Sequence, residues 1–346
     1  MGELLIDFVS VAAGVSIKDS PGFTKAPGGA PANVAVGVRR LGRTSGFIGK
    51  VGSDDFGRFL GETLAREGVD TRGVRYEDRV RTMLAFVSLG PDGEREFMFY
   101  RHPSADMLLE PSEIDTDLIA GTRVFHHGSI SLITEPSRSA TLAAVEAARA
   151  AGALVSYDPN LRLPLWPTPD EARSTILAAA PSADIIKVSE EELAFLTGVT
   201  GVCEGVRRLR DIVPGDCAIV VTCGRRGCAL ALGGSGRLWL EVPGFNVRAV
   251  DTTGAGDAFV AGLLVGLIEA TGAVGAAATT RTALRVLGEE EWRGALTLAN
   301  AVGALCTTEL GAIPALPTAA EVRAFLSARG FPSPGTSEDE RPQGAL

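Results

Sequence analysis

The stretch with the clearest chemical meaning is a seven-residue string that runs directly into an apolar, helix-like segment. The string is Asp251-Thr252-Thr253-Gly254-Ala255-Gly256-Asp257, and the apolar segment covers 258–268. Small residues leave backbone N–H groups open where a helix begins, so this turn predicts an anion site. Asp257 would repel a bound phosphate, and its position makes sense if it takes a proton from an alcohol that attacks phosphorus. A simple helix cap is the alternative interpretation.

The elements that must position this string alternate between strand-like and helical patterns. We expect strands at 47–52, 124–128, 154–157, 185–188 and 218–222, and helices at 31–41, 56–67, 140–151, 170–180, 190–196 and 258–268. Such alternation predicts a mainly parallel sheet with helices on both faces.

Two segments, about 4–24 and 80–105, carry strand-type residues with no helix between them. The second contains a Gly-Pro-Asp-Gly turn at 90–93, which predicts a hairpin. We interpret both segments as a small β-sheet that forms a lid. The apolar residues of the hairpin, among them Phe86 and Phe99, favour a homodimer through this sheet. A lid folded onto its own domain in a monomer is the alternative.

The composition excludes several classes of partner. The chain has 346 residues, with 33 Lys+Arg against 42 Asp+Glu and a net charge of −9. An acidic chain without a basic block argues against nucleic acid, and the run 258–268 is shorter than the ~20 residues that span a bilayer. Five cysteines without paired short spacings indicate a reducing compartment and no zinc site. We expect a cytoplasmic protein, or a plastid one if the natural N-terminus is longer.

Several strings resemble the ribokinase-like carbohydrate kinases. The string 251–257 resembles the nucleotide-side motif of that family, and Gly28-Gly29-Ala30-Pro31-Ala32-Asn33 resembles its sugar-side di-glycine motif. Strings at 25–33, 47–52, 93–101, 158–162 and 311–317 resemble the fructokinases of plants and bacteria, in family order over about residues 2–325. The resemblance implies a ribokinase-like three-layer sandwich with a mostly parallel central sheet and a small β-sheet lid. One domain would cover 1–330, followed by a disordered tail at 331–346.

The resemblance also implies an activity and its residues. The expected reaction is the ATP-dependent phosphorylation of fructose at its 6-hydroxyl, with 2-keto-3-deoxygluconate or another sugar as the alternative substrate. Asp257 would be the general base, and Gly254, Ala255 and Gly256 would form the anion hole. The sugar would contact Asp7, Gly28, Gly29 and Asn33, with Arg101 and Arg162 on the sugar and phosphate side. ATP would contact Lys187, Thr222, Gly224, Gly227 and Asn300.

Two cation sites are implied by the same resemblance. Glu192 would place Mg²⁺ through water, although Ser189 stands where the wider family has asparagine. Three adjacent glutamates at 190–192 are otherwise typical of an exposed helix start. Asp251 and the carbonyl of Thr253 would form part of a site for a monovalent cation, K⁺.

One departure from the family pattern concerns the start of the chain. Family members carry an apolar strand before the residues that match Gly2-Glu3, so we expect the chain to be part of a longer natural protein. Without that strand, two neighbouring strands would keep unpaired edges. The rival class of function is a non-catalytic, fructokinase-like structural partner in a plastid transcription assembly. The presence of Asp257, Gly254 and Gly256 speaks against it.

Overall fold

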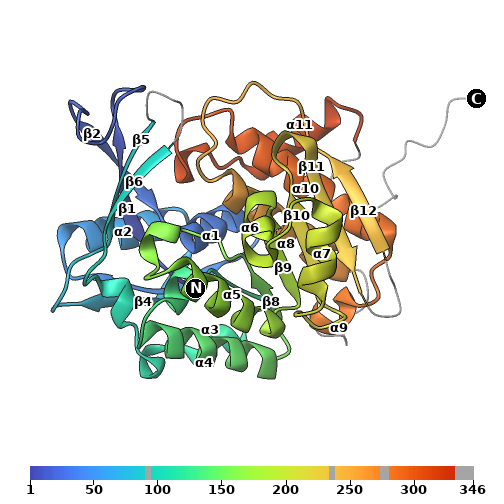
Figure 1. The fold of residues 1–346 in the computed structure, drawn as a ribbon, viewed down its shortest axis with the longest axis horizontal. Helices are drawn as coiled ribbons and strands as arrows, with labels where there is room; N and C mark the ends of the chain where they lie inside the picture. Colours follow the sequence, from blue (N-terminus) through green and yellow to red (C-terminus); the bar gives the residue numbers. More distant parts are fainter. Residues whose placement is uncertain (90–94, 234–237, 273–279, 332–346) are drawn as a thin grey trace, which may run out of the picture.

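The computed structural model describes residues 1–89, 95–233, 238–272 and 280–331. Within them, the larger sheet has the strand order β12-β11-β10-β9-β8-β7 (Figure 1). The parallel part consists of β7 (Val124–His127), β8 (Leu154–Tyr157), β9 (Ile185–Ser189) and β10 (Ala218–Thr222). Two antiparallel strands, β11 (Gly227–Leu232) and β12 (Leu238–Pro243), complete the sheet. The predicted mostly parallel sheet is confirmed.

Helices cover both faces of this sheet, as its alternating apolar side chains require. Along β10, Ile219 and Val221 pack with α5 (Pro169–Ala179), α6 (Glu190–Thr197) and α7 (Val202–Arg210). The intervening Ala218 and Val220 pack with α8 (Ala255–Gly272) and α10 (Glu289–Cys306) on the opposite face. Successive strand residues point to opposite faces, so a strand buried on both sides is apolar throughout. The three-layer prediction is therefore confirmed.

The N-terminal part of the chain contains a second, two-stranded parallel sheet, in which β3 (Gly46–Gly52) pairs with β4 (Asp70–Glu77). Helix α1 (Ala30–Arg40) precedes β3, and α2 (Asp55–Arg66) connects the two strands. Between β3 and β7 lies a cavity of about 410 Å³, lined by residues of both strands and of α1 and α8. In the described residues no strand pairs with either β3 or β7 on the side of this cavity. Both strands therefore keep an unpaired edge, as predicted from the sequence.

The first two residues of the chain each make a hydrogen bond to one of the strands beside this cavity. The amino group of Met1 donates to the carbonyl of His126 at 2.7 Å, and Gly2 N donates to the carbonyl of Ile48 at 3.1 Å. Burial lowers the pKa of the Met1 amino group to about 5, because a buried ammonium loses its hydration. The split sheet is therefore held together at this end by two backbone hydrogen bonds.

A separate four-stranded sheet stands beside the main body (Figure 1). Its strands, in spatial order, are β2 (Phe23–Gly28), β1 (Leu5–Ser10), β5 (Leu84–Leu89) and β6 (Arg95–Tyr100). All four lie in or next to the segments in which we expected lid strands. The predicted turn at 90–93 lies outside the described residues.

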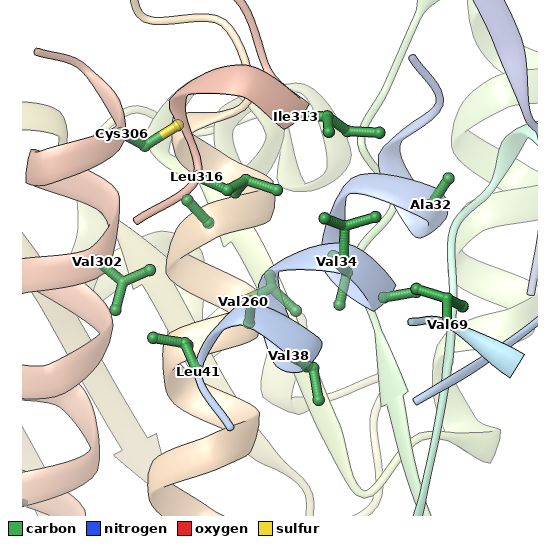
Figure 2. Close-up of a cluster of buried hydrophobic side chains, with 14 of the residues drawn as sticks. Ala32, Val34, Val38, Leu41, Val69, Val260, Val302, Cys306, Ile313 and Leu316 are labelled. Carbon is green, nitrogen blue, oxygen red and sulfur yellow. The ribbon is translucent and has the colours of Figure 1, made fainter. Parts of the chain in front are cut away.

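The helix that carries the Gly-rich string is fixed by close packing of small residues. Figure 2 shows the cluster in which Val34 and Val38 of α1 meet Val260 of α8 and Val302 of α10. A Cβ added at Gly262 would lie 2.9 Å from the Cα of Ala299, and one at Gly266 would lie 2.7 Å from the Cα of Ala295. Helices α8 and α10 approach this closely because the contact is made by glycine and alanine, and the start of α8 is thereby held in place.

Several elements were not predicted from the sequence, namely β4, β11, β12, α7 and α10. Helix α8 is longer at both ends than the predicted helix at 258–268. The predicted helix at 140–151 corresponds to α4 (Ser137–Ala150). Three further short helices are α3 (Thr116–Ala120), α9 (Thr280–Leu284) and α11 (Ala319–Ser327). Of the predicted tail, only Phe331 is described, and its ring packs edge-to-face on Phe245 at 5.4 Å.

Helix α8 is the one described helix that is long and apolar enough, by length and composition, to cross a membrane. It lies mostly buried inside the fold, between the sheet and α1. Core helices of this kind meet the same test, so the helix is explained by the packing of the core.

Candidate active site

The Gly-rich string forms the start of α8, as predicted. Gly254 has φ of +74°, a left-handed conformation that side-chain-bearing residues rarely adopt, and a Cβ there would lie 2.9 Å from the Cβ of Ala312. Helix α8 begins at the next residue, Ala255, so its free N–H groups face the turn. Gly254, Ala255 and Gly256 thus form a compact backbone surface suited to an anion.

Asp257 lies in the first turn of α8 and is 8% exposed. Burial raises its pKa above the ordinary value, although a hydrogen bond from Asn33 and the charges of Arg162 and Lys187 act in the opposite direction. A carboxylate with a raised pKa is a stronger base, and the positive partners keep it available in its ionised form. Its environment therefore suits a group that accepts a proton.

Asn33 connects the two motifs that lie far apart in the sequence. Its Nδ2 donates to Asp257 Oδ2 at 2.7 Å, across a separation of 224 residues. Its Oδ1 is buried and has no hydrogen-bond partner in the described structure. A buried acceptor without a partner is costly, and a ligand hydroxyl beside Asp257 would satisfy it.

The predicted sugar residues gather where the lid sheet joins α1. Strands β1 and β2 pair with Leu5 opposite Gly28, which brings the carboxylate of Asp7 against the end of β2. A Cβ at Gly28 would lie 2.1 Å from Asp7 Oδ2, so only glycine fits at that position. Gly29 follows with φ of +109° and leads into α1, on which Asn33 lies. The structure therefore brings Asp7, Gly28, Gly29 and Asn33 together.

The two predicted arginines differ in their surroundings. Arg162 lies 5.9 Å from the ring centroid of Phe97 in the lid, and its charge lowers the pKa of Asp257. Arg101 is 1% exposed, and its Nε donates to Asp106 at 2.9 Å while Nη2 donates to the carbonyl of Ile130. Arg162 thus connects the lid to the base, whereas Arg101 forms a buried ion pair that anchors the end of the hairpin.

Lys187 extends a buried ammonium toward the anion hole. Its Nζ donates to Asp158 Oδ2 at 3.0 Å, and a Cβ built on Gly256 would lie 3.5 Å from the same Nζ. Burial by itself would lower the pKa of Lys187, but the charges of Asp158, Glu192 and Asp257 outweigh burial and raise it. The ammonium therefore stays charged beside the turn that would hold a phosphoryl group.

The other predicted nucleotide residues lie at one end of the sheet. Thr222 ends β10, and Gly224 and Gly227, with φ of +56° and +100°, form the turn to β11. Asn300 on α10 is buried and donates through Nδ2 to the carbonyls of Val242 and Pro243, each at 3.2 Å. Its amide group thus holds the end of β12 in place. Lys187 lies on β9, the parallel neighbour of β10, directly opposite Val220.

Glu192 has a well-defined structural role. Its Oε1 accepts a hydrogen bond from Leu161 N at 2.7 Å, and its Oε2 accepts one from Ser189 N at 2.8 Å. Ser189 caps α6 in return, so the two residues form a capping box. The described residues contain no cluster of three or more His, Cys, Asp or Glu side chains arranged for a metal ion.

Asp251 fixes the loop that precedes the anion hole. Its Oδ1 accepts hydrogen bonds from the backbone N and the hydroxyl of Thr253, and its Oδ2 accepts one from Gly311 N at 2.9 Å. The side chain therefore joins 251–254 to the loop at Gly311.

The sequence analysis did not assign Asp158 or Glu3. Asp158 lies in the Asp-Pro-Asn string that follows β8, and the position of this acidic residue after a buried parallel strand is the signal that would have found it. Glu3 is buried and carries no such signal, because its importance depends on a contact with Ala30.

A buried base at a helix start, an anion turn and an adjacent ammonium, on a three-layer α/β fold with a lid sheet, define an enzyme that transfers a phosphoryl group to an alcohol. The sequence matches the pfkB family of carbohydrate kinases over residues 1–319. The chain therefore belongs to the pfkB family of carbohydrate kinases, ATP-dependent enzymes that phosphorylate sugars.

Relatives and solved structures agree with this family. The chain is 51% identical to the probable fructokinase-3 of Arabidopsis thaliana over 325 residues, covering 94% of this chain and 90% of that protein. It is 37% identical to a crystal structure of a double mutant of the Vibrio cholerae fructokinase with fructose, ADP and potassium bound, with a TM-score of 0.79 and coverage of 94% and 96%. The fructokinase of Xylella fastidiosa with bound ATP is 34% identical, with a TM-score of 0.83 and coverage of 95% and 97%.

Proposed function

We propose that this protein is a fructokinase, which transfers the γ-phosphoryl group of ATP to the 6-hydroxyl of D-fructose. The observation that carries the proposal is the buried Asp257 at the start of α8, hydrogen-bonded to Asn33 of the sugar-side motif. The similarity to fructokinases, one of them with fructose and ADP bound, supports fructose as the acceptor.

In this proposal each group has a part in the reaction. Asp7, Gly28, Gly29 and the unpartnered Oδ1 of Asn33 hold the sugar hydroxyls, so that the 6-hydroxyl lies against Asp257. Asp257 takes the hydroxyl proton while O6 attacks the γ-phosphorus and the bond from that phosphorus to the β–γ bridging oxygen breaks. The products are fructose 6-phosphate and ADP, and the proton on Asp257 passes to solvent.

The negative charge that develops on the transferred group meets two positive features. The first turn of α8 would face it with its N-terminal N–H groups, and the Lys187 ammonium lies beside Gly256. Preorganised charges in a site closed to water are worth more than the same charges in solution. Arg162, which contacts Phe97 of the lid, adds a further positive charge when the lid covers the sugar.

The cation sites fit the groups that are present. Each Glu192 oxygen accepts one backbone N–H and keeps a second lone pair, which can accept a hydrogen bond from a water molecule bound to Mg²⁺. Mg²⁺, when bound with ATP, neutralises charge on the β- and γ-phosphates. Asp251 and the Thr253 carbonyl would hold K⁺, the ion present in the Vibrio cholerae structure.

A coupled assay of ADP release across fructose, glucose, ribose and 2-keto-3-deoxygluconate tests the proposal. We expect fructose to give the highest kcat/KM, because the site offers neutral and carboxylate acceptors to hydroxyl groups around Asp7 and Asn33. A preference for the sugar acid would instead indicate that Arg162 binds a carboxylate, and would overturn the choice of fructose. ATP binding without ADP release on any of the four sugars would favour the non-catalytic structural role in a plastid transcription assembly.

We further propose a homodimer formed through the lid sheet. The register places Phe86, Met98 and Tyr100 on one face of that sheet, with Tyr100 57% and Met98 39% exposed. Phe86 stacks on Phe8 at 5.0 Å and meets the ring of Tyr100 at 5.5 Å, so this face is a continuous aromatic surface. Phe97 and Phe99 lie on the opposite face of the sheet, and the guanidinium of Arg162 lies 5.9 Å from the ring centroid of Phe97. The hairpin's apolar residues therefore divide between two faces, and only the first offers a surface for a second copy.

Light scattering distinguishes the two faces. We expect Met98→Ser combined with Tyr100→Ser to give a monomer, because the variant replaces the exposed apolar surface with hydroxyls. The matched variant Phe99→Ser, on the opposite face, is expected to remain a dimer and to raise the KM for fructose. A wild-type chain that is monomeric at micromolar concentration would contradict the dimer.

A cytoplasmic location of the protein stays a prediction.

A further inference from the structure

A buried glutamate outside the assigned site contacts the turn that carries the sugar-side motif. Glu3 precedes β1, is 3% exposed, and its Oε1 accepts a hydrogen bond from Ala30 N at 3.0 Å. Ala30 is the first residue of α1, and the residue before it, Gly29, has no side chain with which to cap the helix. Glu3 therefore supplies from elsewhere in the chain the acceptor that a serine or aspartate cap normally supplies.

The backbone of the same residue contacts the other side of this turn. A Cβ added at Gly29 would lie 2.4 Å from the carbonyl oxygen of Glu3, so the two segments touch with no room for a side chain. The Gly29–Ala30 step is thus held between the Glu3 carbonyl and the Glu3 carboxylate. This turn leads from Gly28 and Gly29 into α1, on which Asn33 lies.

The contact continues to the proposed base. Asn33 N donates to the carbonyl of Gly29 at 2.9 Å, in the first turn of α1, and its Nδ2 donates to Asp257. The position of Asn33, and with it the orientation of Asp257 Oδ2, therefore depends on where α1 begins. The Glu3 carboxylate accepts a hydrogen bond from the N–H of Ala30, at which α1 begins.

Keeping Glu3 buried is unfavourable for the fold alone. Burial raises its pKa to about 7, and the negative charges of Asp106 and Asp257 act in the same direction. A buried carboxylate whose pKa is raised by burial and by two negative charges is unfavourable for stability, which favours a functional reason for its presence.

We infer that Glu3 is a positioning residue of the phosphotransfer site, which fixes the Gly28–Gly29–Ala30 turn and Asn33 so that the sugar's hydroxyl meets Asp257. The inference rests on the proposed function, since it assigns Glu3 a part in sugar binding. It requires no contact between Glu3 and the sugar. Its effect is transmitted by the Ala30 N–H and by the first turn of α1.

Kinetics of Glu3→Ala, Glu3→Asp and Glu3→Gln with fructose and ATP test the inference. Glu3→Ala removes the acceptor, and Glu3→Asp shortens the side chain by one methylene while keeping its charge. We expect both variants to raise the KM for fructose about tenfold with the KM for ATP unchanged, because a displaced turn misplaces the sugar. Glu3→Gln keeps an oxygen that accepts from Ala30 N and is expected to restore the KM to within about twofold of wild type.

The control is Asp115→Ala, which removes the carboxylate that accepts a hydrogen bond from Leu118 N at the start of α3. It is expected to lower the melting temperature and leave both KM values unchanged. A wild-type KM for fructose in folded Glu3→Asp would overturn the inference, as would equal changes in both KM values or a Glu3→Gln variant as impaired as Glu3→Ala. If Glu3→Ala does not fold, the Asp and Gln variants decide. A wild-type enzyme with no activity on any sugar would instead refute the proposed function.

Discussion

Asp257→Asn is expected to reduce kcat by ~10²–10⁴-fold, the range associated with the loss of a general base. The amide keeps the shape of the side chain and can still accept a hydrogen bond from Asn33 Nδ2, but it cannot take a proton from the sugar. ATP binding, measured by calorimetry, is expected to remain within about threefold of wild type because the backbone of the 254–256 turn is unchanged. Activity close to wild type would contradict the assignment of the base.

The stability of the same variant separates a catalytic role from a structural one. Burial raises the folded-state pKa of Asp257 above that of the unfolded chain. The stability that follows from this shift is present at low pH and is lost as the pH rises through the folded-state pKa, so at pH 7 the ionised carboxylate disfavours the fold. Asp257→Asn is therefore expected to melt at the same temperature as wild type or at a higher one.

The pH dependence of the wild-type enzyme follows from the same shift. We expect kcat/KM to fall as the pH is lowered through the pKa of Asp257, and the midpoint to lie above the ordinary aspartate value of 3.8. Asp54→Asn provides a matched control, since Asp54 caps α2 through Gly57 N and lies outside the site. Its pH profile is expected to match that of wild type.

Lys187→Met is expected to lower kcat by ~10²–10³-fold, the loss typical for the removal of one preorganised group that stabilises developing charge. The methionine fills a similar volume but removes the ammonium that lies beside Gly256. The KM for fructose is expected to change little, because Lys187 lies on the phosphate side of Asp257. The coupled ADP assay and a fructose titration give both constants.

A second buried lysine controls for the loss of stability. Lys50 is 4% exposed and pairs with Glu77 at 3.2 Å and with Glu113 at 2.8 Å, away from the site. Breaking either buried ion pair by removing one partner costs about 3–5 kcal/mol. Lys50→Met is therefore expected to lower the melting temperature as Lys187→Met does, and to leave kcat unchanged.

The double variant Lys187→Met with Asp158→Asn removes the unpaired carboxylate that the single change leaves behind. If kcat stays low in the double variant, the ammonium itself is needed for transfer. A return to wild-type kcat would show that the single variant failed because of the buried charge at Asp158, and a wild-type kcat in Lys187→Met alone would contradict the role of Lys187 directly.

The parts of the site that could be predicted are those whose chemistry is written in consecutive residues. The string 251–257 predicts a turn, a helix start and a carboxylate because these features depend on neighbouring backbone conformations. The resemblance of the di-glycine motif named Asp7, Gly28, Gly29 and Asn33 as one group, and the structure brings Gly28 against Asp7. The strands of the parallel sheet were predicted for a related reason, since burial on both faces requires continuous β-branched runs.

The elements that were missed lack such local signals. The edge strand β12 alternates exposed and buried residues within a short segment, and β4 contains two arginines and a glycine, so neither contains the continuous apolar run of a buried strand. Helix α10 begins with three glutamates and contains two glycines and four alanines. This composition is explained only by the close contact of α10 with Gly262 and Gly266 of α8.

By itself, the sequence determined the class of fold, the position of the anion turn and the identity of the carboxylate that would act as base. Only the tertiary structure decided which groups surround that carboxylate: Asn33 from 224 residues away, and the ammonium of Lys187 held by Asp158. It also decided that Glu3 caps α1 and that the lid's apolar residues divide between two faces. The physical reason is that a local pattern specifies backbone conformation and burial, whereas pairing between distant side chains depends on how whole elements pack.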